Sequence, residues 1–239
     1  MFNPQPRASR ISLGVHLGVL HDAIVLDDFL LDAEALVAMA HQHREAFAAA
    51  SSNAFPGPEL PLPDRVMAAW TEALLLYAGD ALGMRRVRRA HGRLSVVTLQ
   101  PEALGPIQRL CHRDRLGTAH GEVPLACVAY LFKDPSLGGT AFYRARQLMA
   151  DTDALMHNAA ANDHAWLTHE LGIGPAYMTR GNAWFDQTAV VPARFNRAVF
   201  YRGDLFHTSH IEHPERLNMN ANLGRLTMNG FFVCQPARV

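Results

Sequence analysis

Apolar and polar residues alternate along several short stretches between residues 88 and 234, which is the pattern of strands that have one buried face. Clusters of Gly, Pro, Asn and Asp separate these stretches, and such residues favour turns. The pattern predicts strands near residues 88–99, 107–113, 124–132, 139–143, 184–191, 196–202, 205–210 and 224–234. We therefore expect a mostly β fold with flanking helices, of the α+β class.

Helical spacing of apolar residues precedes these strands. A helix is expected to begin after Asp32, a favourable N-cap residue, and to run to about Ala50. A second helix should begin near Asp64 and run to about Leu82. Both are expected to lie against the outer face of a sheet.

The stretch from 144 to 181 interrupts the strand pattern, and residues 146–158 and 162–171 within it are expected to be helical. One interpretation makes this insertion a lid over a substrate pocket, with Met149, Met156 or Trp166 facing the site. The other makes it a packing element or the contact surface of a homodimer.

Composition indicates an ordinary globular protein. With 239 residues, 49% of them hydrophobic, the chain is expected to form one domain over residues 1–239. Its formal net charge is zero, which gives no reason to expect binding to nucleic acid or to an anionic membrane. The sequence shows neither a signal-peptide pattern nor an apolar run long enough to span a bilayer, so a cytoplasmic location is expected.

Three cysteines, Cys111, Cys127 and Cys234, are scattered in apolar surroundings. An odd number without a paired spacing predicts small buried residues in a reducing compartment, not disulfides.

The triplet His112-Arg113-Asp114 is the main candidate for chemistry. In an extended segment, side chains two residues apart share a face and lie roughly 6–7 Å apart, so His112 and Asp114 can hold one metal ion from one side. A second histidine from a distant strand would complete the two-His-one-carboxylate set of non-haem Fe(II) oxygenases. The alternative is a surface pair in which Asp114 is bridged to a neighbouring arginine.

Other histidine-x-acid triplets are weaker candidates. His43-Arg44-Glu45 lies in an expected helix, where residues two apart do not share a face. Two more triplets, which begin at His210 and His213, lie in a polar stretch that is expected to be a loop.

The surroundings of the triplet resemble the Fe(II)/2-oxoglutarate-dependent oxygenase superfamily, specifically its prolyl-4-hydroxylase-like branch. The resemblance runs from about Ala23 to Phe232 through AIVLDDFLLDAEAL, FPGPELPLP, the HRD triplet, VAYLF, GGTAFYR, NRAVFYRGDLFH and RLT. Each motif is short, and their order carries the resemblance. It implies a double-stranded β-helix of the jelly-roll or cupin-like kind, and Fe(II) and 2-oxoglutarate as cofactor and cosubstrate.

Carried onto this sequence, the resemblance implies that His112, Asp114 and His207 are the iron ligands, which makes them the catalytic residues. His210 competes with His207 for the distal position. His207 is preferred because it directly follows Asp204-Leu205-Phe206, where the next strand should begin.

The resemblance also implies residues that hold the far carboxylate of 2-oxoglutarate. Arg225 beside Thr227 fits this role, and Arg216 is the alternative because the gap from His207 to Arg225 is long for the family. Tyr130 would help to hold the same carboxylate, or would simply be a core tyrosine.

The last predicted strand supports this assignment independently of the resemblance. Residues 225, 227 and 229 are Arg, Thr and Asn on one face, whereas Leu226, Met228 and Phe232 fall on the other. If the apolar face packs under helices, the polar face must pair with something inside, and an arginine suits a carboxylate. The alternatives are a polar face in water, or a turn at Asn229-Gly230 that ends the strand.

The expected function is a dioxygenase that hydroxylates or otherwise oxidises a C–H bond of a small molecule or an amino-acid side chain in a peptide, with succinate and CO2 as co-products. One alternative keeps the metal without 2-oxoglutarate, as in a cupin-like oxygenase or isomerase. Another is a non-catalytic protein that binds a metal or a carboxylate. The sequence does not name the substrate.

Overall fold

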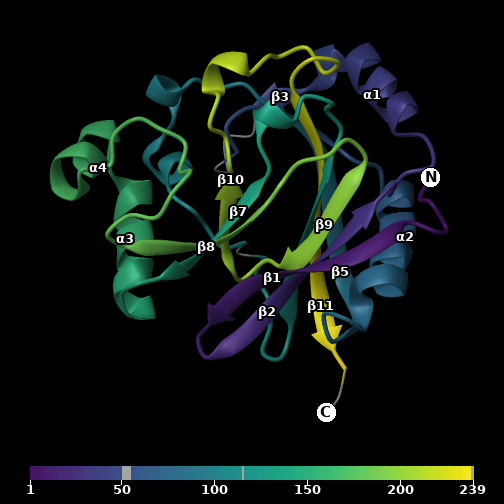
Figure 1. The fold of residues 1–239 in the computed structure, drawn as a ribbon, viewed down its shortest axis with the longest axis horizontal. Helices are drawn as coiled ribbons and strands as arrows, with labels where there is room; N and C mark the ends of the chain where they lie inside the picture. The colour runs from purple at the N-terminus through teal and green to yellow at the C-terminus, as the bar shows by residue number, and fades with distance from the viewer. Residues whose placement is uncertain (50–54, 115, 238–239) are drawn as a thin grey trace.

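Figure 1 shows a mostly β fold in the computed structural model, which describes residues 1–49, 55–114 and 116–237. Within these residues the strands form two antiparallel sheets, one of eight strands in the order β1-β2-β9-β6-β11-β5-β4-β3 and one of three in the order β10-β7-β8. The larger sheet contains β1 (Arg7–His16), β2 (Val19–Asp27), β3 (Ala48–Ala49), β4 (Pro58–Pro61), β5 (Met84–Val97), β6 (Val123–Tyr130), β9 (Arg197–Arg202) and β11 (Arg225–Pro236). The smaller contains β7 (Thr140–Ala145), β8 (Phe185–Val191) and β10 (Phe206–Ser209).

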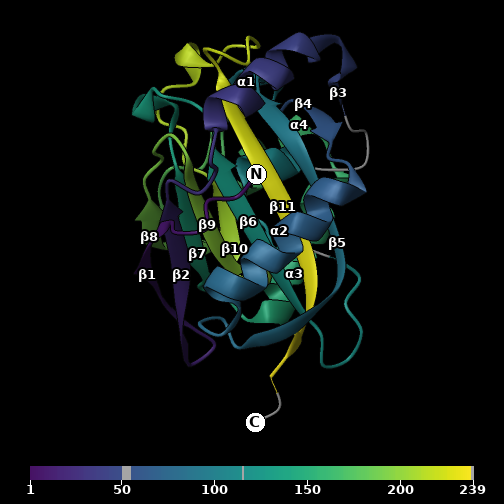
Figure 2. The same cartoon turned by 90° about the vertical axis from the view of Figure 1, so that its right-hand side faces the viewer.

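The helices lie on two sides of the molecule. Helices α1 (Ala33–Gln42) and α2 (Asp64–Leu74) cover the outer face of the larger sheet, as Figure 2 shows. Helices α3 (Met149–Ala161) and α4 (His164–Leu171) pack beside the smaller sheet, on the opposite side in Figure 1. Every helix among the described residues is too short or too polar to cross a bilayer.

The alternation of apolar and polar residues along β11 explains why α2 packs on one face of the larger sheet and polar side chains lie on the other. Leu226, Met228 and Phe232 are buried toward α2, where the rings of Phe232 and Trp70 meet edge to face at 5.7 Å. Arg225 and Thr227 are almost completely buried on the other face. The alternative of a polar face in water is therefore wrong.

The alternative of a turn at Asn229-Gly230 is also wrong, because both residues stay in β11, where Gly230 pairs with Gly92 of β5. A Cβ atom on Gly230 would lie 2.9 Å from the rings of Trp70 and Phe232. The glycine is thus required by ring packing and not by a turn.

A second apolar cluster fills the space between the two sheets. It joins inward-facing residues of β6 and β9, such as Val128 and Val199, to Phe142 of β7. The three cysteines are free and buried, as expected.

The segment 107–113 is not a strand, which corrects the prediction. Residues Pro106–Arg109 form a 3-10 helix, and only His112 makes a β-bridge. Pro106 stands at the start of this turn, where its fixed φ and missing N–H suit a helical first position.

The N-terminal elements also differ from the prediction. Helix α1 is capped by Asp32 as expected but ends at Gln42, and β3 follows, whereas Ala50 lies outside the described residues. Helix α2 ends at Leu74 and continues as a π-helical turn, Leu75–Gly79. Strand β1 was not predicted, because its residues are largely exposed and show little alternation.

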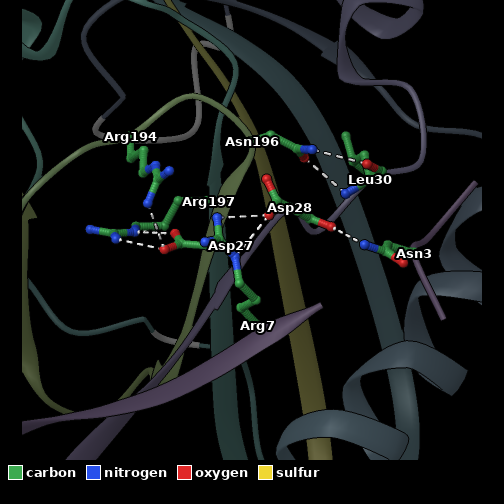
Figure 3. Close-up of polar contacts among 8 residues, drawn as sticks. All are labelled: Asn3, Arg7, Asp27, Asp28, Leu30, Arg194, Asn196 and Arg197. Atoms are coloured by element: carbon green, nitrogen blue, oxygen red, sulfur yellow. Dashed lines mark hydrogen bonds and ion pairs between the residues drawn. The ribbon is translucent and has the colours of Figure 1, made fainter. Parts of the chain in front are cut away.

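A cluster of ion pairs joins the end of β2 to β9 (Figure 3). Asp27 accepts hydrogen bonds from Nε and Nη2 of Arg197, at 2.6 and 3.0 Å, and one from Nη1 of Arg194 at 3.1 Å. Beside it, Asn196 exchanges two hydrogen bonds with the backbone of Leu30. The hydrogen bonds from Arg197 lower the pKa of the Asp27 carboxyl.

We predict that Asp27→Asn lowers the free energy of unfolding at neutral pH by about 1–3 kcal/mol, because it removes a charged acceptor from a fork of donors. A lowered folded-state pKa means that this stabilisation is full above the unfolded pKa, about 4, and is lost as pH falls through the folded value. Urea unfolding at neutral and acidic pH should show the wild-type and variant curves converging in acid.

Asp28→Asn is the matched control. Asp28 pairs with Arg7, but both side chains are more than half exposed, at 54% and 64%, so we expect a change below about 1 kcal/mol. Equal losses for the two variants would contradict the special role of Asp27.

Candidate metal centre

His112, Asp114 and His207 converge at one point although they are distant in sequence. Their potential ligand atoms all lie within 4.8 Å of one another. The Nε2 atom of His112 is 3.9 Å from one carboxylate oxygen of Asp114, and the Nε2 atom of His207 is 3.8 Å from the other.

The backbone explains this convergence. His112 and His207 exchange both of their backbone hydrogen bonds, each at 2.9 Å, as an antiparallel pair. Residues paired in this way point their side chains to the same face. The backbone N–H of Asp114 then donates to the carbonyl of Gly203 at 2.7 Å, which keeps the segment extended and returns Asp114 to that face.

Hydrogen bonding fixes which nitrogen of His207 faces the site. Its Nδ1 lies 2.8 Å from the carbonyl oxygen of Leu205, which can only accept, so Nδ1 carries the proton. Burial lowers the pKa of His207 to about 4, and the ring is therefore neutral at neutral pH. Its Nε2 presents a lone pair toward Asp114.

Asp114 and His112 complete a set of electron-pair donors. Burial raises the pKa of Asp114 to about 6, and enclosure together with the nearby His207 lowers that of His112 to about 4. At neutral pH the group thus comprises two neutral imidazoles and one carboxylate.

A divalent cation fits this arrangement. Oδ2 of Asp114 is buried and receives no hydrogen bond from any described residue. A buried acceptor without a partner is unfavourable, and a cation among the three groups would satisfy it. Two imidazoles and one carboxylate on one side form the donor set typical of non-haem Fe(II) sites.

The site opens into a cavity of about 700 Å³ between the two sheets. Its wall includes all three members of the group, Arg225 from β11 and the Phe55-Pro56 segment that precedes β4. Met156 and His157 of α3 also line it. This contact favours the lid interpretation of the insertion, although Met149 and Trp166 pack in the apolar cluster beside β7 and β8 instead.

Arg225 reaches the cavity but is also held by the backbone. Its Nε donates to the carbonyls of Leu137 and Gly138 at 3.0 and 3.3 Å, and its Nη2 donates to that of Gly139 at 2.9 Å. Among the described residues no carboxylate pairs with it.

Thr227 and Tyr130 do not line the cavity. Thr227 accepts a hydrogen bond from Asn229 and contacts the carbonyl of Ser95. The hydroxyl of Tyr130 lies 2.8 Å from that of Thr140, and burial raises the pKa of Tyr130 to about 12. Only Thr140 of this pair reaches the cavity wall.

The competing candidates lie elsewhere. Nε2 of His210 is 3.1 Å from the carbonyl of Thr179, and His210 is not part of the convergent group. Arg216 pairs with Asp134 at 3.6 Å, outside the cavity.

Sequence reasoning missed several cavity residues. Tyr201 packs against His207 with ring centres 4.8 Å apart, and its position on β9 gives no sequence signal for this. Arg93 and His91 of β5 also line the cavity, together with Phe231 of β11. The two-residue spacing of His91 and Arg93 indicates that they share one face of β5. The sequence alone does not show that β11 is the neighbouring strand, because this requires the register.

Gly203 allows the carboxylate of Asp114 to approach, because a Cβ atom there would lie 2.8 Å from Oδ2. We predict that Gly203→Ala displaces the carboxylate and weakens Ni(II) binding about 10- to 100-fold. Mutation of residues that orient metal ligands typically weakens metal binding by this factor. Calorimetric titration of Ni(II) measures the effect.

Gly174→Ala is the control, since a Cβ atom there meets nothing within 4 Å. Unchanged Ni(II) affinity in Gly203→Ala would contradict the geometry assigned to Asp114.

The comparisons with known proteins place the chain in a family. No curated protein matches the sequence. Among solved structures, HygX from Streptomyces hygroscopicus with nickel and 2-oxoglutarate bound is 12% identical, with a TM-score of 0.48 over 90% of this chain and 83% of that one. SnoN, a non-haem α-ketoglutarate-dependent epimerase from nogalamycin biosynthesis, is 12% identical, with a TM-score of 0.46 over 91% and 82%. An N-substituted L-amino acid dioxygenase from Burkholderia ambifaria is 10% identical, with a TM-score of 0.41 over 97% and 99%.

Likeness of this extent leaves the function to be argued from the site itself. The family described as "Family of unknown function (DUF6445)" matches residues 7–232. This match covers nearly the whole chain, and the protein therefore belongs to the DUF6445 family.

Proposed function

We propose that the protein is a non-haem Fe(II)/2-oxoglutarate-dependent oxygenase with a double-stranded β-helix core. The observation that carries the proposal is the convergence of His112, Asp114 and His207, with an unpaired buried carboxylate oxygen, at the wall of a cavity. Within the superfamily, the order of the sequence motifs favours the prolyl-4-hydroxylase-like branch.

The three ligands would hold iron from one side. His112 pairs with His207 at the edge of the smaller sheet, Asp114 follows two residues later, and all three side chains line the cavity. The rings of Tyr201 and Phe142 pack around His207, at 4.8 and 6.3 Å, and keep water away from that ligand.

Arg225 is the proposed anchor for the far carboxylate of 2-oxoglutarate. Its hydrogen bonds use Nε and Nη2, and Nη1 bonds no described residue. Charge supports this assignment, because Fe(II) beside Asp114 leaves one positive charge and Arg225 adds a second, which together balance a dicarboxylate dianion.

When bound, iron and 2-oxoglutarate would supply the oxidation of a substrate C–H bond, with succinate and CO2 as co-products. We propose hydroxylation of a small molecule or an amino-acid side chain as the outcome. The residues of the chain orient the ligands, anchor the cosubstrate and exclude water, and α3 limits access from one side.

A second candidate is a metal-dependent protein that does not use 2-oxoglutarate. It is favoured by one observation, namely that the contacts of Arg225 with three backbone carbonyls also serve to hold the Leu137–Gly139 turn. In that case Arg225 would be a structural residue only.

Two measurements test the proposal. Under anaerobic conditions, Fe(II) and 2-oxoglutarate together should give a visible charge-transfer band that neither gives alone. In air, the protein should form succinate from 2-oxoglutarate slowly even without a substrate. Metal binding without either signal would favour the second candidate, and the absence of metal binding would reject both.

We predict that Asp114→Asn abolishes succinate formation and weakens Fe(II) binding at least about tenfold, because an amide is a neutral and poorer ligand. Asp186→Asn is the control, since Asp186 forms an exposed ion pair with Arg144 and Arg146 away from the cavity. Equal Fe(II) affinities in the two variants would refute the ligand assignment.

We predict that Arg225→Gln raises the dissociation constant of 2-oxoglutarate about 10- to 100-fold while Ni(II) affinity stays within about twofold, because a charged hydrogen bond contributes about 1.5–3 kcal/mol. Arg225→Lys keeps the charge and should lose less affinity. Calorimetry of 2-oxoglutarate binding to the Ni(II)-loaded protein gives the comparison. An unchanged constant in Arg225→Gln would assign Arg225 to structure alone.

A further inference from the structure

The cavity wall contains a second arginine, on the same face of the larger sheet as Arg225. In the antiparallel register, Arg93 of β5 is paired with Asn229 of β11, and His91 is paired with Phe231. All four residues line the cavity. None of them is used by the iron site or by the proposed 2-oxoglutarate anchor.

The two arginines occupy different regions of the wall. Asn229, the partner of Arg93, is four residues along β11 from Arg225, which corresponds to about 13 Å at the rise of a strand. Between them, Thr227 and Ser95 are buried in a hydrogen-bonded pair of strands. A cosubstrate held by Arg225 and the metal would therefore leave the region around Arg93 for another molecule.

The guanidinium of Arg93 is fixed on two sides. Its Nε lies 2.6 Å from Oε1 of Glu59, a buried residue of β4, in an ion pair without an aligned hydrogen bond. Its central carbon lies 4.6 Å above the ring of Phe231. These contacts leave both terminal amino groups without a bond to any described residue, at the wall of the cavity.

Arg93 and the candidate metal centre share one cavity. The wall that contains Arg93 also contains His112, Asp114 and His207. A molecule bound at the guanidinium can therefore extend through the cavity toward the metal.

We propose that Arg93 binds a carboxylate of the substrate and thereby sets the substrate class, an organic acid with an apolar body. This inference rests on the proposed function. A planar guanidinium with two free amino groups matches a carboxylate in a bidentate pair.

The surrounding side chains match the rest of such a substrate. Phe231 and His91 stack with ring centres 5.0 Å apart and an angle of 16°, and both line the cavity beside Arg93. Ile107, Leu110 and Met156 add apolar surface to the same cavity. Because Glu59 already compensates one charge, the site suits a carboxylate monoanion better than a phosphate dianion.

The test compares matched acids and amides. The probes are hexanoate, 3-phenylpropanoate and N-acetyl-leucine, each paired with its primary carboxamide. Calorimetry measures their binding to protein saturated with Ni(II) and 2-oxoglutarate, so that the acids cannot compete for Arg225. We expect at least one acid to bind about tenfold or more tightly than its amide, as a charged pair requires.

The variants assign this preference to Arg93. Removing Arg93 alone would take away the arginine that pairs with the buried Glu59, so the double variant Arg93→Gln/Glu59→Gln keeps the charge balanced. It should lose the preference for acids while 2-oxoglutarate affinity stays unchanged, and Arg93→Lys should retain part of it. Arg88→Gln, at an exposed position of the same strand, is the control and should retain all of it.

Each outcome decides between the two proposals. If no acid binds better than its amide, or if the preference survives in the double variant, the assignment of Arg93 is wrong. If the wild-type protein does not take up Ni(II) and 2-oxoglutarate, the proposed function fails instead. The same probes applied to the metal-free protein then test Arg93 alone.

Discussion

The exchange of two backbone hydrogen bonds between His112 and His207 is the constraint on which the site depends. It joins a short extended segment to the edge strand of the smaller sheet, and it turns two distant imidazoles toward one point. Asp114 joins them because its own N–H bonds the carbonyl of Gly203, where the absence of a side chain leaves room for the carboxylate. The segment of His112 and Asp114 needs no regular strand of its own for this geometry. One bridge to His207 of β10 and the space left by Gly203 position it.

The chemistry follows from burial. The side chains of Asp114 and His207 are buried, His112 lies beside them, and one carboxylate oxygen receives no hydrogen bond from the described residues. A cation resolves this arrangement, and the cavity beyond it gives room for other molecules. Along the larger sheet, Arg225 and Arg93 then divide that room into a region near the Leu137–Gly139 turn and a region above Phe231. We infer that the first takes the cosubstrate and the second the substrate.

Many of the strands and the faces of several site residues could be predicted from the local sequence, because side chains in a strand alternate between two faces. The burial of Arg225 opposite Leu226 and Met228 was predicted on that basis, and so was the shared face of His112 and Asp114. The segment before His112 was predicted wrongly as a strand, because its apolar residues have a strand-like pattern. In the structure, Pro106 begins a 3-10 helical turn there. A turn at Asn229-Gly230 remained an alternative to the continuous strand, because the packing of the Trp70 ring that requires the glycine cannot be seen in the local sequence. The role of Arg93 depends on the register of β5 with β11 and on its pairing with Glu59 of β4. Neither the register nor the pairing can be read from a single sequence.

The most direct measurement is a crystal structure of the protein grown with Mn(II) and 2-oxoglutarate, with data collected at the manganese absorption edge. The account predicts one strong anomalous peak within bonding distance of Nε2 of His112, Nε2 of His207 and a carboxylate oxygen of Asp114, with 2-oxoglutarate extending from the ion toward Arg225. A peak at another place, or a cavity that contains 2-oxoglutarate but no metal at these three side chains, would contradict it.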